Sequence, residues 1–422
     1  MNMVLFEDEN YLNFLPLVYF RPVWELRCGA MTIETKVQRS LGEGFYYHSR
    51  AYLENTQLVT DRLSSKLNAD EEVLYLNSRW LIRPQDRLCL TELAQGKALV
   101  YQEDVLAFKT RAGAVARVLS NQIIDSKRVR EAFETVNYPV SEECKTPKVM
   151  HYLWDLVLQN GAEIVADYAH HKNRGIIAGK ISEGVHLIGP RERICIEADA
   201  VLSPGVVIDA ENGPVWIDRG AKVMANSVIE GPVYIGKNST IKIAAKIYEN
   251  TTIGPVCKVG GEVEESIIHS YSNKQHDGFL GHAYLGSWVN LGADTNNSDL
   301  KNNYGKIKVF LNGRQVDTGE RFVGLMMGDH SKTAINAMFN TGTVVGVCCN
   351  IFGTGMPPKF VPSFTWGGAE SITEYKFDKA LEVAKVVMSR RKVDFSDEYR
   401  QVFDTVHRLA KNIEEGSPIC TQ

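Results

Sequence analysis

Aliphatic residues recur at every sixth position through the middle of this chain. A first run of three is followed by three extra residues at 212–214, after which the spacing resumes for eight more: Ile196, Leu202, Ile208, Ile217, Val223, Ile229, Ile235, Ile241, Ile247, Ile253 and Val259. A period of six fits neither an α-helix nor an alternating strand. It is typical of a parallel β-helix, in which each coil is a triangle of short strands and the aliphatic side chains stack inward about 4.8 Å apart. The pattern therefore predicts such a prism over residues 185–368.

The six-residue spacing is interrupted in the second half of this region. It returns at Phe279, Leu285 and Leu291, and again at Phe339, Val345 and Ile351. The segment between 296 and 330 is too irregular for coils and contains the turn pair Asn312-Gly313. We expect a loop with a small hairpin that protrudes from the prism, and such excursions often carry function.

The two ends of the chain show other patterns. In residues 1–180, the apolar run 73–76 predicts a buried strand that ends at Asn77, whereas 105–121, 126–136 and 149–159 have helical periodicity. Alternating strands and helices indicate an α/β domain with a mostly parallel sheet. In residues 370–422, two amphipathic helices are predicted at 375–391 and 396–413, with Asp394 and Ser396 as candidate caps and a packing role.

Composition and charge narrow the class of protein. A length of 422 residues suits two or three domains, and a net charge of −4 gives no general attraction to nucleic acid or to an anionic membrane. No apolar run approaches the roughly 20 residues that span a bilayer, and the acidic N-terminus shows no signal peptide. The eight cysteines form no CxxC pair, which argues against structural zinc and favours reduced thiols. We expect a cytoplasmic protein without nucleic-acid or membrane partners.

A motif within residues 274–305 connects the prism with a known family. It comprises His276, Leu280-Gly281, the run Asn290-Leu291-Gly292-Ala293-Asp294-Thr295, and Asn303-Tyr304-Gly305. This spacing resembles the acetyltransferase half of the bacterial bifunctional enzymes that make UDP-N-acetylglucosamine. That resemblance implies a left-handed β-helix that transfers an acetyl group from acetyl-CoA to glucosamine-1-phosphate.

The N-terminal segment 15–36 is similar to a divergent, Bacteroidetes-type branch of the same architecture. Its pattern of Arg-Pro, Glu-Leu-Arg-x-Gly and Glu-x-Lys opens the nucleotidyltransferase domain of that branch. The resemblance implies three parts: a nucleotidyltransferase-like α/β domain (1–180), a left-handed β-helix acyltransferase domain (185–368) and a C-terminal helical segment (370–422).

The acetyl-transfer step needs a base that removes a proton from the attacking amine, and imidazole is suited to this near neutral pH. His276 lies in the polar loop 272–278, where the spacing is interrupted, so it can reach a substrate; the plain alternative is a solvent-exposed loop histidine. The resemblance assigns Asn290, Asn303 and Tyr304 to substrate binding. It places Gly292 and Ala293 on the groove for the pantetheine arm of acetyl-CoA.

One departure concerns the phosphate of the acceptor sugar. The family holds it with an Arg and a Lys on earlier coils, and the Lys position falls near Glu264, which cannot bind phosphate. Lys258, Lys246 and Lys242 are the candidate replacements. The identity of the acceptor is therefore more open than the acetyl transfer.

Nucleotidyl transfer requires cations for a triphosphate and carboxylates for Mg²⁺. The Gly-rich phosphate loop of ordinary members is replaced here by the acidic run 5–10. The cations of the divergent motif, Arg21, Arg27 and Lys36, are candidate nucleotide ligands, although surface ion pairs explain the arginines equally well. Asn77 stands where the ordinary family has a metal-binding Asp, and Asp155 offers a carboxylate for Mg²⁺.

Three hypotheses follow from these observations. The leading one is an enzyme of sugar-nucleotide biosynthesis that transfers acetyl from acetyl-CoA and a nucleotidyl group from UTP, or another nucleoside triphosphate, to a sugar phosphate. A second is a single-function sugar-1-phosphate nucleotidylyltransferase, such as a thymidylyltransferase acting on glucose-1-phosphate. A third is a catalytically silent binding subunit. Because β-helix acyltransferases generally associate through their flat faces, we expect a homotrimer.

Overall fold

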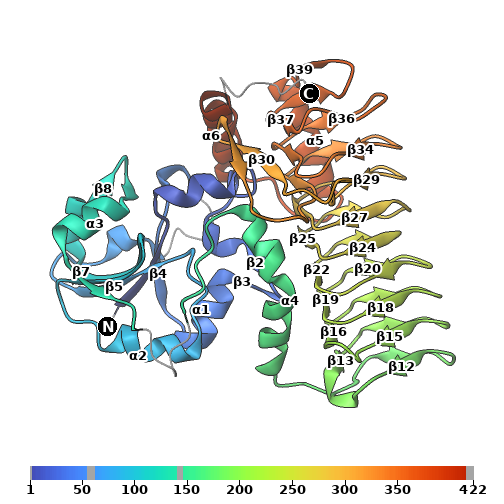
Figure 1. The fold of residues 1–422 in the computed structure, drawn as a ribbon, viewed down its shortest axis with the longest axis horizontal. Helices are drawn as coiled ribbons and strands as arrows, with labels where there is room; N and C mark the ends of the chain where they lie inside the picture. Colours follow the sequence, from blue (N-terminus) through green and yellow to red (C-terminus); the bar gives the residue numbers. More distant parts are fainter. Residues whose placement is uncertain (1, 55–61, 140–145, 415–422) are drawn as a thin grey trace.

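The computed structural model describes residues 2–54, 62–139 and 146–414. An α/β domain lies beside a tall triangular prism of stacked coils, and two C-terminal helices lie at the upper end of the prism (Figure 1). The predicted fold class is confirmed: an α/β domain, a left-handed parallel β-helix and C-terminal helices.

The N-terminal domain is built on a six-stranded sheet with the strand order β10-β6-β7-β5-β1-β4. Its strands are β1 (Asn2–Phe6), β4 (Phe45–His48), β5 (Glu72–Asn77), β6 (Lys97–Tyr101), β7 (Asp104–Arg111) and β10 (Glu134–Asn137). β1 pairs in parallel with β4 and β5, as β10 does with β6, whereas β7 is antiparallel to both neighbours. The sheet is therefore mixed, and the strand predicted at 73–76 is β5.

Of the helical predictions in this domain, that at 105–121 is wrong and that at 126–136 is correct only in its first part. Residues 105–121 form β7, a 3-10 helix (Ala112–Val118) and the first strand of the hairpin β8 (Leu119–Ser120) and β9 (Ile123–Ile124). Because β7 is a central strand, its apolar residues make a continuous buried run, which periodicity cannot separate from a buried helix. Segment 126–136 is helical only in α3 (Ser126–Ala132) before β10 begins.

Helices cover both faces of this sheet. α1 (Ile33–Leu41) and α4 (Leu153–Ala169) pack on the face that carries Leu74, and α3 packs on the face that carries Val73. The short α2 (Arg87–Thr91) and the hairpin β2 (Arg27–Cys28) and β3 (Met31–Thr32) complete the domain. α4, predicted at 149–159, also contacts the prism at β19 and β22, so it joins the two parts.

The prism has three faces, which we name by their strands. The long face is β13 (Ile194–Ile196), β16 (Val215–Ile217), β19 (Val233–Ile235), β22 (Thr251–Ile253), β25 (Ile267–Ser270), β28 (Tyr284–Ser287), β32 (Met326–Met327), β35 (Val344–Val345) and β37 (Phe360–Val361). The second face begins with β11 (Lys180–Ile181), β14 (Val201–Leu202), β17 (Lys222–Val223), β20 (Thr240–Ile241), β23 (Lys258–Val259) and β26 (Asn273–Lys274), and continues after an interruption with β33 (Lys332–Thr333), β36 (Asn350–Ile351), β38 (Thr365–Gly367) and the antiparallel β39 (Ile372–Glu374). The third face is β12 (His186–Ile188), β15 (Val207–Asp209), β18 (Val228–Glu230), β21 (Lys246–Ile247), β24 (Glu262–Glu264) and β27 (Phe279–Gly281), followed by the separate pair β29 (Asn296–Asn297) and β34 (Met338–Phe339).

The six-residue pattern forms the core of the prism. All eleven aliphatic residues of the repeat are at most 1% exposed, and each stacks on its equivalents in neighbouring coils. Phe279 is an exception, because Leu280 takes the inward position opposite Val263 while Phe279 is only half-buried. The predicted excursion contains the hairpin β30 (Lys308–Leu311) and β31 (Arg314–Asp317).

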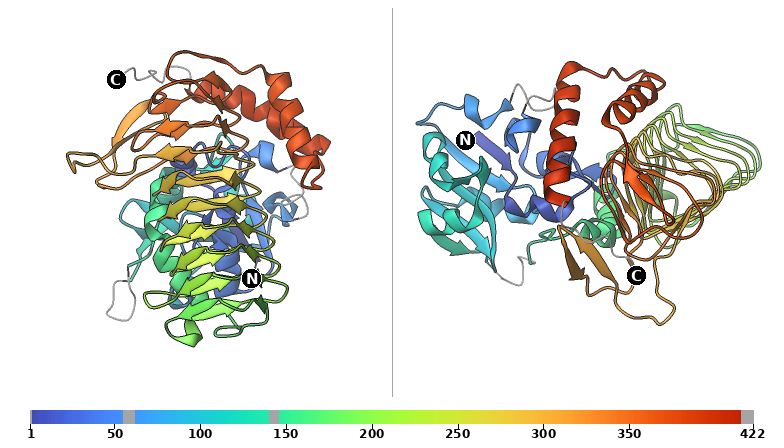
Figure 2. Two further views of the ribbon diagram at one scale, coloured as in Figure 1. Left: turned by 90° about the vertical axis from the view of Figure 1, so that its right-hand side faces the viewer. Right: turned by 90° about the horizontal axis from the view of Figure 1, so that it is seen from above.

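The three parts of the molecule share one core. Both predicted C-terminal helices are present, as α5 (Phe377–Ser389) and α6 (Asp397–Glu414). On α6, Phe403 is fully buried and its ring lies 5.1 Å from that of Phe20. The same hydrophobic cluster includes Tyr284 of the long face, so the N-terminal domain, the long face and α6 are packed together. Seen from above, the domain and helices lie beside the triangular stack (Figure 2).

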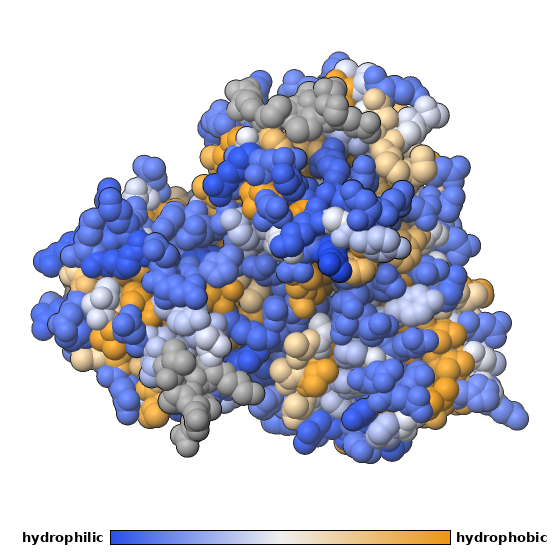
Figure 3. Space-filling view, in the orientation of Figure 1, coloured by the Kyte–Doolittle hydropathy of each residue, from blue (hydrophilic) through white to orange (hydrophobic). Residues whose placement is uncertain are grey.

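The surface and the cysteines fit the composition. Hydrophilic residues cover most of the face shown in Figure 3, with smaller hydrophobic patches between them. Among the described residues, no helix combines the length and apolar character needed to cross a membrane. Six cysteines are described, and five of them are buried free thiols: Cys28, Cys195, Cys257, Cys348 and Cys349. Cys144 and Cys420 lie outside the described residues.

Candidate functional site

His276 lies on the corner of the prism between β26 of the second face and β27 of the third face. This corner is opposite the long face, so the imidazole is exposed and directed away from the N-terminal domain. Lys274, just before it, is buried, and its Nζ donates to the backbone oxygens of Gly260 (3.0 Å) and His276 (3.1 Å). Burial lowers the pKa of Lys274 to about 8. The lysine thus fixes the backbone from which the histidine projects.

The predicted cofactor residues lie one coil above His276. Because Asn290 pairs with Asn273, the register places Gly292 beside Gln275 and Ala293 beside His276. The Asp294 amide donates to Asp277 O at 3.0 Å, which continues this alignment, and Gly292 N donates to Thr333 Oγ1 at 2.9 Å. The structure therefore brings the predicted base and the predicted pantetheine groove to adjacent coils of one corner.

The predicted substrate residues are divided between two places. Asn290 Oδ1 accepts from Asn273 Nδ2 at 3.3 Å, and Arg391 from the segment after α5 donates to Asn273 Oδ1 at 2.7 Å. Asn303 and Tyr304 lie on the excursion before β30, where both are exposed, Tyr304 by 68%. Asn290 is next to the corner, while the other two extend outward from the prism.

The candidate phosphate-binding lysines lie on different faces. Lys246 is on the third face, where its Nζ is 3.3 Å from Glu262 Oε2. Lys258 is on the second face, where partial burial and repulsion from Arg391 and Lys242 lower its pKa. Within one chain these two lysines do not converge on one phosphate.

Glu264, the residue at the family's lysine position, belongs to a small acidic group on the third face. His282 Nδ1 is 2.9 Å from Asp299 Oδ2, and Glu264 lies within 4.8 Å of both groups. Burial, together with the negative charge of Asp299, raises the pKa of Glu264. This surrounding does not suit an anion.

In the N-terminal domain, Arg21 connects to the prism instead of lining a cavity. Its side chain is buried and forms a bidentate ion pair with Asp329, and it also donates to Ser287 Oγ at 3.0 Å and Leu17 O at 3.1 Å. The guanidinium therefore has its hydrogen-bonding capacity largely occupied. Arg27, in contrast, is half-buried, and among the described residues its guanidinium donates only to the backbone oxygens of His269 (3.1 Å) and Ala30 (2.9 Å).

Lys36 and Asn77 also have internal partners. Lys36 is 2% exposed and its Nζ lies 2.9 Å from Glu163 and 2.7 Å from Asp167, both on α4. Asn77 donates to Asp8 Oδ2 and to Val105 O, each at 2.9 Å. Both residues stabilise the domain by these contacts. Lys36 borders a cavity of about 620 Å³ beside α4, whereas Asn77 lines none of the four cavities described.

Asp155 caps the start of α4. Its Oδ2 accepts from the amides of His151 (2.7 Å) and Tyr152 (3.0 Å), and burial raises its pKa. A carboxylate held in this way does not fit a Mg²⁺ ligand, so we derive no reaction step through a metal at this residue. Its capping role was visible in the sequence only as an acidic residue in the first turn of a helix.

The carboxyl ends of β1 and β5 carry a buried ion-pair network that the sequence did not reveal. Arg79 lies between Asp8 (2.6 Å) and Asp104 (2.7 Å). Burial alone would raise the pKa of Asp8, but the charge and hydrogen bonds of Arg79 outweigh it and lower that pKa. Beside this network is a cavity of about 460 Å³, lined partly by Glu9, Arg50 and residues of α6.

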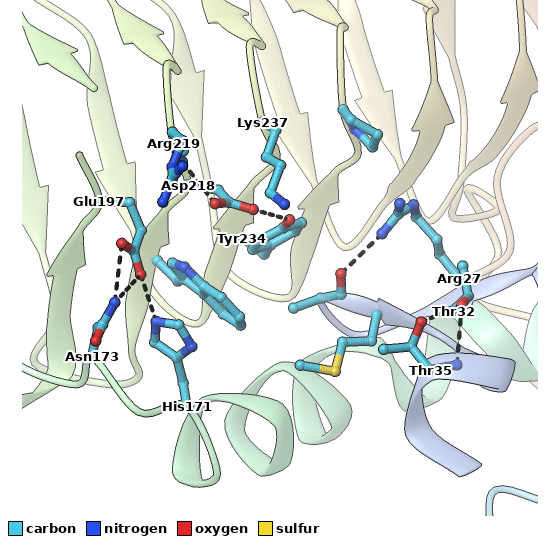
Figure 4. Close-up of a pocket in the computed structure, with 14 residues that line it drawn as sticks. Arg27, Thr32, Thr35, His171, Asn173, Glu197, Asp218, Arg219, Tyr234 and Lys237 are labelled. Carbon is cyan, nitrogen blue, oxygen red and sulfur yellow. Dashed lines mark hydrogen bonds and ion pairs between the residues drawn. The ribbon is translucent and has the colours of Figure 1, made fainter. Parts of the chain in front are cut away.

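A second cavity, of about 530 Å³, lies between the N-terminal domain and the lower coils of the long face; we call it the interdomain groove (Figure 4). Its polar lining includes Arg27, Thr32, Thr35, His171, Asn173, Glu197, Asp218, Arg219 and Lys237, and its apolar lining includes Ala30, Met31, Trp216, Tyr234 and Pro255. Of the four predicted nucleotide ligands, Arg27 is the one that lines this groove. The β-helix residues of the groove carry no sequence motif, so sequence reasoning missed them.

Comparisons with known proteins agree with the nucleotidyltransferase-like domain and with the resemblance to bifunctional enzymes. Residues 3–174 match the family model of sugar nucleotidyl transferases. A bifunctional sugar-1-phosphate nucleotidylyltransferase/acetyltransferase of Sulfurisphaera tokodaii is 32% identical over 146 residues, which cover 33% of this chain and 35% of the relative. The bifunctional protein GlmU of Methanocaldococcus jannaschii is 32% identical over 120 residues, 28% of each chain. The chain thus spans no more than about a third of the length of these relatives, and the resemblance read from its motifs is confirmed.

Among solved structures, the UDP-N-acetylglucosamine acyltransferase of Campylobacter jejuni is similar to this chain with a TM-score of 0.22 and 17% identity, over 56% of this chain and 82% of that one.

Proposed function

We propose that the protein is an enzyme of sugar-nucleotide biosynthesis that acetylates an amino-sugar phosphate at the corner carrying His276. The observation that carries the proposal is the placement of His276 and Ala293 on adjacent coils of one exposed corner. Acetyl-CoA supplies the acetyl group as a reactive thioester. His276 takes the proton of the amine as its nitrogen forms the new amide bond, and the departing thiolate of coenzyme A receives a proton.

The proposal includes a homotrimer, because one chain presents this corner as an edge and not as a cleft. Ile243, Ile335 and Phe352 occupy the same corner on other coils and are 61%, 69% and 38% exposed. Exposed apolar side chains in a row favour a contact with another copy. The N-terminal domain covers the long face, so the second and third faces are left for this contact. Light scattering that shows a monomer at micromolar concentration would contradict the trimer.

The acetyl-transfer proposal is tested by incubating the protein with acetyl-CoA and glucosamine-1-phosphate and measuring free thiol. We expect His276→Ala to lower the rate by roughly 10²- to 10⁴-fold, the usual contribution of a general base. His186→Ala is the matched control, since His186 is an exposed histidine on the third face, several coils away. A rate that His276→Ala leaves unchanged would refute the assignment.

We further propose that the N-terminal domain transfers a nucleotidyl group from UTP to the acetylated sugar phosphate. The match of residues 3–174 supports this half, as does the cavity of about 460 Å³ at the carboxyl edge of the sheet, where ligands of open α/β sheets bind. Arg50 brings positive charge to that cavity, although Glu7 Oε1 already binds its guanidinium at 3.1 Å. Pyrophosphate release from UTP and N-acetylglucosamine-1-phosphate tests this step.

One observation favours a second candidate, in which the N-terminal domain is catalytically silent. Arg21, Lys36 and Arg79 are all buried in ion pairs, so their charges are already neutralised inside the protein. A folded, acetylating protein that releases no pyrophosphate from UTP, or from dTTP with glucose-1-phosphate, would support this candidate. The second of these assays also tests the single-function thymidylyltransferase.

A further inference from the structure

The interdomain groove carries cations that have no internal partner. Arg219 and Lys237 are exposed, and neither side chain forms a hydrogen bond or an ion pair within the described part of the chain. They occupy equivalent positions on neighbouring coils, because Ile217 pairs with Ile235 two residues earlier. Adjacent coils are about 4.8 Å apart. The two side chains therefore present a pair of cations at a spacing that suits neighbouring phosphate oxygens.

A third cation approaches from the other domain. Figure 4 shows Arg219 and Lys237 extending from successive coils toward the groove, and Arg27 facing them from the N-terminal domain. The hydroxyl side chains of Thr32 and Thr35 lie on the same side as Arg27. Guanidinium and ammonium groups are the usual protein ligands of phosphate.

Two carboxylates also line the groove, and internal hydrogen bonds hold both of them in place. Glu197 Oε1 lies 2.8 Å from His171 Nε2 and 3.0 Å from Asn173 Nδ2. Asp218 is buried and accepts from the hydroxyl of Tyr234 at 2.8 Å and from the Arg219 amide at 2.7 Å. Because three cations (Arg27, Arg219 and Lys237) face these two carboxylates, the groove keeps a net positive charge.

The rest of the groove is apolar and aromatic. Trp216 and Tyr234 meet edge-to-face with ring centroids 5.0 Å apart, and the His171 ring is tilted against Trp216 with centroids 4.0 Å apart. Met31 and Pro255 extend this surface. A volume of about 530 Å³ is within the usual range for small-molecule sites. This apolar floor offers contact surface to the ring of a nucleoside, while the cations suit an attached phosphate chain.

We propose that the interdomain groove binds a nucleoside phosphate, with its phosphates held by Arg27, Arg219 and Lys237 and its ring against the apolar floor. This site is separate from the corner of His276 and from the carboxyl edge of the N-terminal sheet, so it goes beyond the proposed function. The ligand contacts both domains and therefore stabilises their association.

The first test is calorimetric titration with UDP. The double variant Arg219→Ala/Lys237→Ala should bind UDP at this site roughly 100-fold more weakly, about tenfold for each lost cation. The matched control is Lys222→Ala, which removes an exposed lysine from the second face. UDP binding that the double variant retains in full would overturn the proposal. Inorganic pyrophosphate that binds as tightly as UDP would overturn the ring contact.

The second test locates the ligand in the unaltered protein, so it does not depend on the variants. UDP should slow amide hydrogen exchange in 27–32, 216–219 and 234–237. Protection confined to other segments, such as the carboxyl edge of the N-terminal sheet, would overturn the groove as the site. Neither test uses turnover, so a failed acetyl-transfer assay and a failed groove assay are distinguishable.

Discussion

Replacing Arg21 with alanine should destabilise the protein, because Arg21 is the buried link between the N-terminal domain and the prism. Its guanidinium binds Asp329 in a bidentate ion pair, and the side chains of Arg21 and Asp329 are 8% and 2% exposed. Asp329 also accepts from the Ser287 amide at 3.0 Å. Alanine removes the cation and leaves the carboxylate buried and unpaired, a change that typically costs about 3–5 kcal/mol.

Denaturant unfolding of the single and double variants measures this cost. We expect Arg21→Ala and Asp329→Asn to lower the free energy of unfolding each on its own. The double variant Arg21→Ala/Asp329→Asn should lose less than the sum of the singles, by roughly 2 kcal/mol, because it leaves no unpaired charge. Arg400→Ala is the control, since Arg400 is exposed on α6, and it should change stability by less than about 0.5 kcal/mol.

The same experiment separates the structural role from the nucleotide-binding role predicted by the sequence resemblance. If Arg21 bound a nucleotide, Arg21→Ala would raise the KM for UTP while the free energy of unfolding stayed nearly constant. A loss below about 1 kcal/mol would refute the argument from the buried ion pair.

Three further predictions concern the prism and the thiols. Ile235→Ala should cost about 2–5 kcal/mol in unfolding experiments, and the exposed Ile176→Ala less than about 1 kcal/mol; equal losses would contradict the inward stack. Burial lowers the pKa of Lys274 to about 8 from 10.5, so the unfolded chain binds more protons between these values and stability should rise with pH there. Relative to Lys274→Met, that rise amounts to up to about 3 kcal/mol, and identical pH slopes would be evidence against it. The buried thiol of Cys257 should react with an alkylating reagent only after denaturant is added, and labelling in the folded protein would show that the coils open.

The prism was predictable because its rule is local. Each coil repeats the same short geometry, so Ile217, Ile235 and Ile253 specify an inward position without reference to the rest of the chain. The period also contains information about the site. His276 and Ala293 are 17 residues apart, about one coil, and the structure places them side by side. Lys246 and Lys258 are 12 residues apart, two thirds of a coil, and they lie on different faces.

Long-range pairings were not predictable from the pattern. The strand β7 has the composition of a buried helix, and only its position between β5 and β6 determines that it is a strand. Arg21 and Asp329 are 308 residues apart in the chain, and no spacing rule connects them. The interdomain groove also depends on a long-range contact. In the sequence Arg219 and Lys237 look like ordinary surface cations, and only the packing of the N-terminal domain places Arg27 opposite them.

The position of the N-terminal domain explains why one chain can hold two kinds of site. The buried contacts of Arg21 with Asp329 and of Tyr284 with Arg27 fix the domain on the long face. The hairpin β2–β3 of the domain closes the groove from one side. The corner that carries His276 lies opposite and is left free for contact with another copy. A domain docked on either of the other faces would cover that contact, so docking on the long face is the arrangement in which trimer formation and the interdomain groove are compatible.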